Sequence, residues 1–260
     1  MNIDTMIFEL QNPEVFGSKH LFATITVFLL IAILLVFLLK VAKHVRHRRV
    51  LQVATIFLIL LELLKYTHAL VTDGSFPLIY IPMQLCSFSL YLMPLVSFGN
   101  EKLSRKVMPI SYSIGMMAGL IVLFYPATVL GGAYSWLPLS ENLIPLISFL
   151  YHGTMVFFSM YLVMSKQYRP TFKDYGKVYF ALLLFASMAV VTNLIFDTDM
   201  MFLNTANGSP LQFILTEYGR VPYMAAMLVL AAIILALPVL PFAFSRKEAY
   251  AKQSVSKIGS

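Results

Sequence analysis

Long apolar runs separated by short polar connectors dominate the chain. Seven runs are long enough to cross a bilayer, because a helix needs roughly 20 mostly apolar residues to span a hydrocarbon core of ~30 Å. Their ranges are 20–39, 50–71, 77–98, 107–126, 143–165, 177–197 and 218–243. A helix satisfies its backbone hydrogen bonds within one segment, which an open strand in lipid cannot do. The pattern predicts an all-α, polytopic membrane helix bundle of about seven transmembrane helices.

The composition agrees with this pattern. Apolar residues make up 59% of the 260 residues and charged residues only 12%, whereas soluble domains contain about half and a quarter. A soluble fold could not bury so much apolar surface. We therefore expect a multi-pass protein of the cell membrane. Residues 1–245 are predicted to form a single transmembrane helical domain, and residues 246–260 a short basic cytoplasmic tail.

Positive charge alternates between the connectors. All but three of the 19 Lys and Arg residues follow the first, third, fifth or seventh apolar run, and the connectors 72–76, 127–142 and 198–217 contain none. Since loops rich in Lys and Arg face the cytoplasm, we predict an N-terminus outside and a C-terminus in the cytoplasm. The net charge of +7 then reports topology, and nucleic acid is not expected as a partner.

Several ionisable side chains lie inside the apolar runs, where a charge costs at least about 2.5 to 3.5 kcal/mol at a helix centre and needs a reason. Glu62, Lys65 and His68 follow one another at intervals of three in LELLKYTHAL, so they project from roughly one helical face. Glu62 and Lys65 either neutralise each other and only fix packing, or belong to a functional polar site.

Three different runs bring polar groups to a similar depth. Glu62, Cys86 and His152 each lie about nine or ten residues from the predicted outer end of a run, or roughly 15 Å at 1.5 Å per residue. A thiol becomes a good nucleophile when a nearby base takes its proton, and an acidic group can orient that base. We therefore predict one buried site with Cys86 and His152 as the catalytic pair. Pro82 and Pro94 would loosen the helix around the thiol.

Other polar residues flank this predicted site. Gln84 and Ser87 are candidates to hold an oxyanion. His20 lies near the outer end of the first run, where we expect an interfacial position, and Asn193 lies near the outer end of the sixth. The connector that follows, DTDMMFLNTANGSP, has an apolar MMFL centre, which is either a lid over the site or an ordinary interfacial patch.

Patterns typical of metal and cofactor sites are missing from the sequence. The chain has a single cysteine, no glycine-rich phosphate loop and no histidine pair at ligand spacing within a run, so we predict no bound metal and no cofactor. Gly115 and Gly119 in GMMAG have the spacing that lets two helices approach closely. We expect them to pack within the bundle, with a homo-oligomer formed through them as the alternative.

The segments HLFATITV, LELLKYTH, IPMQLCSFSLY, YPATVLGGAYSWLPL, LYHGTMVF and TNLIFDTDMMFLN together resemble the YwaF-like family of integral membrane proteins, whose animal relatives are the transmembrane protein 164 proteins. The similarity covers roughly residues 15–205. It implies a phospholipid acyltransferase that uses a membrane cysteine and histidine and is similar in fold to the androgen-induced lipid hydrolases. By motif, that pair falls on Cys86 and His152.

The chain departs from the family pattern at two places. It has Gln84 where the family often has a histidine, and Asp199 and Met200 where the family often has an Asn-Tyr pair. If those family residues assist catalysis, acyl transfer by this chain would need other groups or another substrate.

These observations lead to three hypotheses. The first is a lipid acyltransferase or acyl hydrolase acting on glycerophospholipid esters through Cys86 and His152, with membrane lipids as both environment and substrate. The second is a small proton- or ion-coupled transporter that uses Glu62, Lys65 and His152. The third is a catalytically silent membrane partner of another protein.

Overall fold

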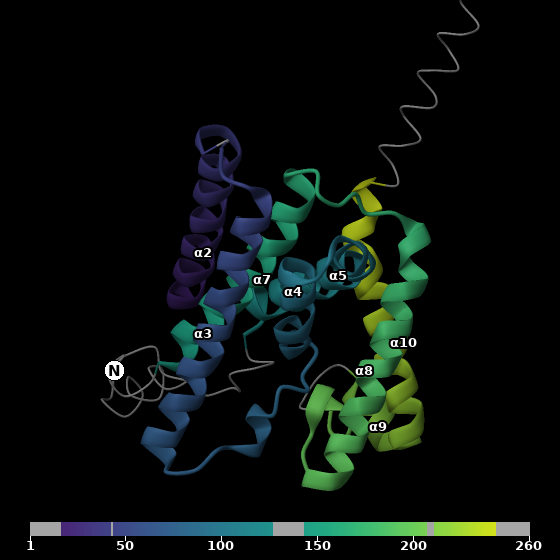
Figure 1. The fold of residues 1–260 in the computed structure, drawn as a ribbon. Helices are drawn as coiled ribbons and strands as arrows, with labels where there is room; N and C mark the ends of the chain where they lie inside the picture. The colour runs from purple at the N-terminus through teal and green to yellow at the C-terminus, as the bar shows by residue number, and fades with distance from the viewer. Residues whose placement is uncertain (1–16, 43, 127–142, 207–210, 243–260) are drawn as a thin grey trace, which may run out of the picture.

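The computed structural model describes residues 17–42, 44–126, 143–206 and 211–242, and within these ranges it contains helices and no strands. Six helices are long and apolar enough to cross a membrane, which confirms the all-α, multi-pass bundle (Figure 1). They are α2 (Ser18–Val36, extended by a π-helical turn at Phe37–Val41), α3 (His47–Asp73), α5 (Glu101–Phe124), α7 (Ile144–Met164), α8 (Tyr175–Phe196) and α10 (Arg220–Ala236). The predicted tail 246–260 lies outside the described residues.

The third apolar run does not form the continuous helix that the sequence predicted over 77–98. It consists of a 3₁₀ turn at Leu78–Tyr80, an irregular stretch, a second 3₁₀ turn at Cys86–Phe88 and the short helix α4 (Ser89–Phe98). Proline explains the break. Ile81 has an extended conformation with a ψ of 126°, as proline imposes on the residue before it, and Pro82 itself lacks the N–H that a helix would need there.

The broken third run still crosses the bundle. Arg48, at the start of α3, donates hydrogen bonds of 2.7 to 3.0 Å to three backbone oxygens at the end of α4. These oxygens belong to Ser97, Phe98 and Gly99. The end of α4 is therefore level with the start of α3, so residues 74–98 return over the depth that α3 covers. The prediction of about seven segments is roughly consistent with the six long helices and the shorter apolar helix Cys86–Phe98 of the broken run.

Side-chain contacts join the ends of long helices. The start of α2 meets the end of α5 through His20 and the Leu123 carbonyl oxygen at 2.9 Å. The start of α3 meets the end of α7 through His47 and the Tyr161 hydroxyl at 2.8 Å. These contacts place the start of α2 beside the end of α5 and the start of α3 beside the end of α7. The full alternation of the connectors stays a prediction from the distribution of Lys and Arg. The cytoplasmic location of the basic side stays a prediction from charge.

Helix α7 lies at the centre of the bundle and packs against α2, α3 and α5. Glycines allow the close approach. A Cβ on Gly119 would lie 2.9 Å from the backbone oxygen of His152, and one on Gly115 would lie 2.7 Å from the Ser159 hydroxyl. Gly115 and Gly119 thus pack α5 against α7 within the chain, as the sequence predicted.

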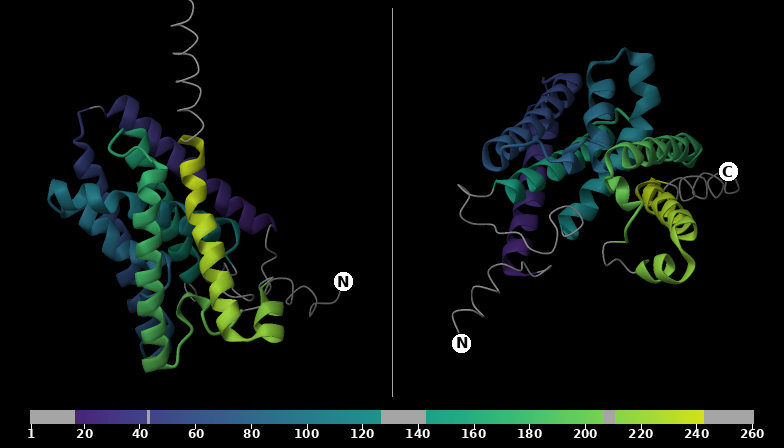
Figure 2. Two further views of the ribbon diagram at one scale, coloured as in Figure 1. Left: turned by 90° about the vertical axis from the view of Figure 1, so that its right-hand side faces the viewer. Right: turned by 90° about the horizontal axis from the view of Figure 1, so that it is seen from below.

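The long helices form two flanks. Helices α2 and α3 lie on one side of the bundle, and α8 and α10 run side by side on the other, as Figures 1 and 2 both show. Helix α5 crosses α8 and α10 steeply, since Figure 1 views it almost end-on. The short helix α9 (Gln212–Tyr218) leads into α10 through a turn at Gly219.

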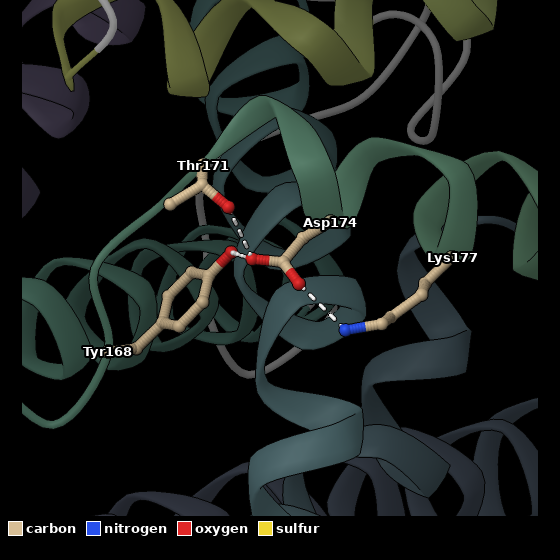
Figure 3. A network of polar contacts seen from close by, with 4 residues as sticks. All are labelled: Tyr168, Thr171, Asp174 and Lys177. Carbon is tan, nitrogen blue, oxygen red and sulfur yellow. Dashed lines mark hydrogen bonds and ion pairs between the residues drawn. The ribbon is translucent and has the colours of Figure 1, made fainter.

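A polar network closes the connector between α7 and α8 (Figure 3). The Asp174 carboxylate accepts hydrogen bonds from the Thr171 hydroxyl at 2.9 Å, from Lys177 at 2.7 Å and from the Tyr168 hydroxyl at 3.4 Å. Burial, reinforced by the Asp174 charge, raises the pKa of Tyr168, so its hydroxyl stays protonated and donates. The network holds the 3₁₀ turn Phe172–Asp174, from which α8 begins.

Candidate functional site

A cavity of about 690 Å³ lies between the flanks, with walls from α3, the third run, α5, α7, α8 and α10. This cavity is lined by most of the residues that the sequence analysis predicted for a functional site. They are Glu62, Lys65, Gln84, Cys86, Ser87 and His152. The structure therefore gathers a thiol, an imidazole, a carboxylate and an ammonium group around one space.

Cys86 lies where the irregular part of the third run becomes helical. It begins the 3₁₀ turn Cys86–Phe88, which continues directly into α4. The start of a helix carries a partial positive charge that favours an anion beside it. The thiol is free and the residue only partly buried. The break at Pro82 thus leaves Cys86 on the cavity wall instead of in a continuous helix packed among its neighbours.

His152 is held in one orientation within α7. The residue is 3% exposed, and its Nδ1 lies 2.7 Å from the backbone oxygen of Ser148. A carbonyl oxygen only accepts hydrogen bonds, so Nδ1 carries the hydrogen and Nε2 keeps the lone pair. The buried Nε2 atom has no hydrogen-bond partner among the described residues. This tautomer leaves the ring nitrogen that can take a proton without a described partner, on a residue that lines the cavity.

Glu62 and Lys65 form a partly buried ion pair. Lys65 Nζ lies 2.7 Å from a Glu62 carboxylate oxygen and 4.9 Å from the centre of the Tyr80 ring. The pairing that the sequence offered as one alternative is therefore present, and both residues also line the cavity. Glu62 and Lys65 thus share the cavity wall with Cys86 and His152.

The connector after α8 forms another wall of the cavity. Its apolar centre contributes Met201, Phe202 and Leu203. The Gln84 side-chain oxygen accepts a hydrogen bond from the Met201 N–H at 2.7 Å, and the Asn193 amide binds the backbone N–H and oxygen of Met200 at 2.6 and 3.1 Å. Gln84 and Asn193 therefore position this wall. Asn193 does not itself reach the cavity, and the Gln84 oxygen is engaged by the backbone.

The second departure from the family pattern, Asp199 and Met200, has a structural role in the same connector. Asp199 accepts hydrogen bonds from the backbone N–H groups of Asn204 at 2.7 Å and Thr205 at 3.1 Å. Met200 is fully buried. Met201 and Phe202 adopt left-handed conformations with φ of 59° and 53°, which are costly for residues other than glycine. Backbone N–H groups of this connector donate hydrogen bonds to the side-chain oxygens of Asp199, Gln84 and Asn193, and these bonds hold the strained wall in place.

His20 lies outside the cavity and is buried between helices, and its interfacial depth in the membrane stays a prediction. The residue is 2% exposed, and its Nε2 donates to the Leu123 oxygen at 2.9 Å. Thr24 donates to the same oxygen at 3.0 Å. Because two side chains of α2 converge on the last turn of α5, His20 joins helices instead of facing a substrate. His68, on the same helical face as Glu62 and Lys65, does not line the cavity either.

Two features of the cavity were not predicted from the sequence, namely Tyr151 and the apolar wall. Tyr151 precedes His152 in α7, is 5% exposed and lines the cavity, and its hydroxyl has no partner among the described residues. An aromatic residue in an apolar run is usually core, although a hydroxyl next to an intramembrane histidine was a usable signal. The wall from α10 comprises Met227, Leu228, Leu230, Ala231, Ile234 and Leu235.

Three comparisons with known proteins place these observations in context. The TMEM164 family matches the chain over residues 15–240, which agrees with the resemblance in the sequence. No curated protein and no solved structure matches the chain. Among the described residues, no group of three or more His, Cys, Asp or Glu side chains is arranged to hold a metal ion. The matched range includes every residue that lines the cavity.

Proposed function

This chain belongs to the TMEM164 family, and we propose that it is a membrane-embedded acyltransferase or acyl hydrolase that acts on glycerophospholipid esters through Cys86 and His152. One observation carries the proposal. The same cavity is lined by a free thiol, Cys86, and an imidazole, His152. The Nε2 atom of this imidazole has no partner among the described residues. A thiol next to a base is the usual arrangement for attack on a carbonyl carbon.

The chemistry would proceed in two halves. Cys86 Sγ attacks the ester carbonyl carbon while His152 Nε2 takes the thiol proton, and the tetrahedral intermediate then expels the glycerol oxygen, which receives that proton. The product is a thioester on Cys86. In the second half, water or a lysolipid hydroxyl attacks the thioester and gives its proton to Nε2, and the proton returns to sulfur as the carbon–sulfur bond breaks. Water would give hydrolysis, and a lysolipid would give transfer.

The cavity suits a lipid ester in size and lining. Its volume of about 690 Å³ lies within the roughly 300 to 1,000 Å³ of typical ligand pockets. Polar groups come from α3, the third run and α7, whereas the α10 wall is aliphatic. An ester carbonyl at Cys86 would therefore place its acyl chain along α10. Glu62 and Lys65 would support the polar end, where Lys65 can balance negative charge as it develops.

Capture of the acyl-enzyme tests this proposal. Purified protein is reconstituted in vesicles of phosphatidylcholine and phosphatidylethanolamine whose acyl chains carry a terminal alkyne. The alkyne attached to the Cys86 peptide is then measured by mass spectrometry before and after hydroxylamine, which cleaves thioesters. We expect a hydroxylamine-sensitive acyl group on Cys86 in the wild type.

Variants decide between catalysis and incidental acylation. His152→Gln should form the thioester slowly, whereas His20→Gln, which changes a buried histidine outside the cavity, should form it at the wild-type rate once folded. Phospholipid turnover that continues in Cys86→Ala would rule out the thioester route. Failure of the wild type to acylate Cys86 or to change any lipid would contradict the proposal as a whole.

A further inference from the structure

Tyr151 has no role in the two half-reactions described above, although it lines the cavity beside the proposed base. We infer that the Tyr151 hydroxyl is the hydrogen-bond donor that stabilises the oxyanion when Cys86 attacks the ester carbonyl. This inference rests on the proposed acyl chemistry and assigns a catalytic contact that neither the family pattern nor the sequence indicated.

The first argument is the unused hydroxyl. Tyr151 is 5% exposed, lines the cavity, and has no hydrogen-bond partner for its hydroxyl among the described residues. Burying a hydroxyl without a partner costs free energy, so native proteins satisfy nearly all of them. Other buried tyrosines follow this rule. Tyr112 donates to the Pro238 oxygen at 3.0 Å, and Tyr223 donates to the Phe202 oxygen at 2.8 Å.

The second argument is that two other polar side chains of the cavity wall already have partners. The Gln84 side chain accepts from the Met201 N–H at 2.7 Å and donates to the Asp199 backbone oxygen at 3.5 Å. The Lys65 ammonium is paired with Glu62 at 2.7 Å. The Tyr151 hydroxyl, by contrast, has no hydrogen-bond partner among the described residues, and Tyr151 and Cys86 line the same cavity. Tyr151 is thus a neutral donor with unused bonding capacity on the wall that carries this thiol.

The third argument is geometric. Tyr151 and His152 are consecutive residues of α7, and the His152 ring is fixed by the Ser148 oxygen at 2.7 Å. One rigid helix therefore carries both the proton acceptor and the oxyanion donor, which keeps them in register with each other. Tyr151 keeps its proton throughout. Its O–H bond to the substrate oxygen strengthens as the carbonyl becomes an oxyanion, in both half-reactions.

Two probes of the same thiol separate this role from others. The first is a p-nitrophenyl ester of a long-chain fatty acid, which acylates Cys86 through an oxyanion and releases p-nitrophenolate. The second is an N-alkyl iodoacetamide of the same chain length, which alkylates sulfur by displacing iodide and forms no oxyanion. Both are applied to the full-length protein in phospholipid vesicles, as wild type, Tyr151→Phe and Tyr112→Phe.

For Tyr151→Phe we expect acylation to slow by about 10²- to 10³-fold, the usual effect of removing one oxyanion donor, while alkylation keeps the wild-type rate. The variant should melt no lower than the wild type, because the lost oxygen has no partner to leave behind. Tyr112→Phe, which loses a hydrogen bond to Pro238, should acylate normally and melt lower.

Other outcomes overturn the inference. Unchanged acylation in Tyr151→Phe would show that the oxyanion is stabilised elsewhere, while the proposed function would stand. Equal loss of acylation and alkylation would mean that Tyr151 positions His152 or the fold, not the oxyanion. A wild type that is alkylated but never acylated would defeat the proposed function, and this inference with it.

Discussion

Polar side chains have different roles in two regions of the bundle. One region is the basic end, which carries the connectors rich in Lys and Arg, and the other is the cavity. At the basic end, Arg48 binds three carbonyl oxygens of α4, and Asp174 gathers Thr171, Lys177 and Tyr168. At the cavity, His152 keeps a buried atom that has no partner among the described residues. Paired groups join elements of the fold, whereas a residue that lines the cavity and keeps unused bonding capacity is a candidate to bind a substrate.

The same contrast holds within one residue type. His20 and His152 are both almost completely buried. His20 uses its Nε2 to hold the end of α5, but His152 uses only Nδ1, on its own helix, and leaves Nε2 free of described partners. Burial and residue type therefore do not distinguish these two histidines, whereas an unused atom on a residue that lines the cavity does. His68 Nε2 also lacks a partner among the described residues but does not line the cavity.

The largest effect is expected at the nucleophile. Cys86→Ala should reduce lipid acyl transfer to background, because no other cysteine exists in the chain to carry the thioester. The melting temperature should change little, since the side chain is partly exposed to the cavity. Radiolabelled phospholipid turnover in vesicles measures the first quantity and differential scanning fluorimetry the second. Wild-type turnover in the variant would remove Cys86 from the mechanism.

The histidine pair gives the next largest effect. His152→Gln should lower the acyl-transfer rate by about 10²- to 10⁴-fold, the usual contribution of a general base. His20→Gln should leave the rate per folded molecule unchanged and lower the melting temperature, because it weakens the bond between α2 and α5. Initial rates and melting curves on the two variants provide the comparison. Equal loss of rate in both would contradict the distinction drawn between them.

The apolar wall should control chain length more modestly. Ala231→Phe adds bulk to the α10 side of the cavity, so the ratio of long-chain to short-chain acyl transfer should fall by about tenfold, since one methylene in an apolar pocket is worth at least that factor. Val229→Phe is the matched control, because Val229 is 58% exposed on the same helix and does not line the cavity. A competition assay with acyl chains of different length measures the ratio. An equal shift in both variants would place the chain elsewhere.

The smallest effect is expected at the basic end. Arg48→Met removes three hydrogen bonds to carbonyl oxygens at an exposed position, and we expect a loss of about 1 kcal/mol in the free energy of unfolding, or roughly 2 to 4 °C in melting temperature. Activity per folded molecule should not change. Arg49→Met is the control, because the described residues offer its side chain no hydrogen bond. A large loss of activity in Arg48→Met would link this end to the cavity.

The long helices could be predicted from apolar run length alone, since lipid leaves the backbone few alternatives. The break in the third run could not be predicted in this way, because hydropathy scores side chains and takes no account of the backbone N–H that Pro82 lacks. The grouping of Glu62, Cys86 and His152 could be predicted from equal depth. The burial of His20 could not, because its partner is the Leu123 oxygen, 103 residues away in the sequence. Only tertiary packing reveals which polar atoms have no partner among the described residues, as for the Tyr151 hydroxyl.

The most direct test of the central claim is the rate at which Cys86 reacts with a lipid-tailed chloroacetamide in native membranes, compared between wild type and His152→Gln. A thiol that shares a lipid-accessible cavity with a free base should react readily, and loss of the imidazole should slow labelling at least about tenfold. Absent labelling, or equal labelling in both proteins, would show that Cys86 is an inert packing residue and would contradict the account.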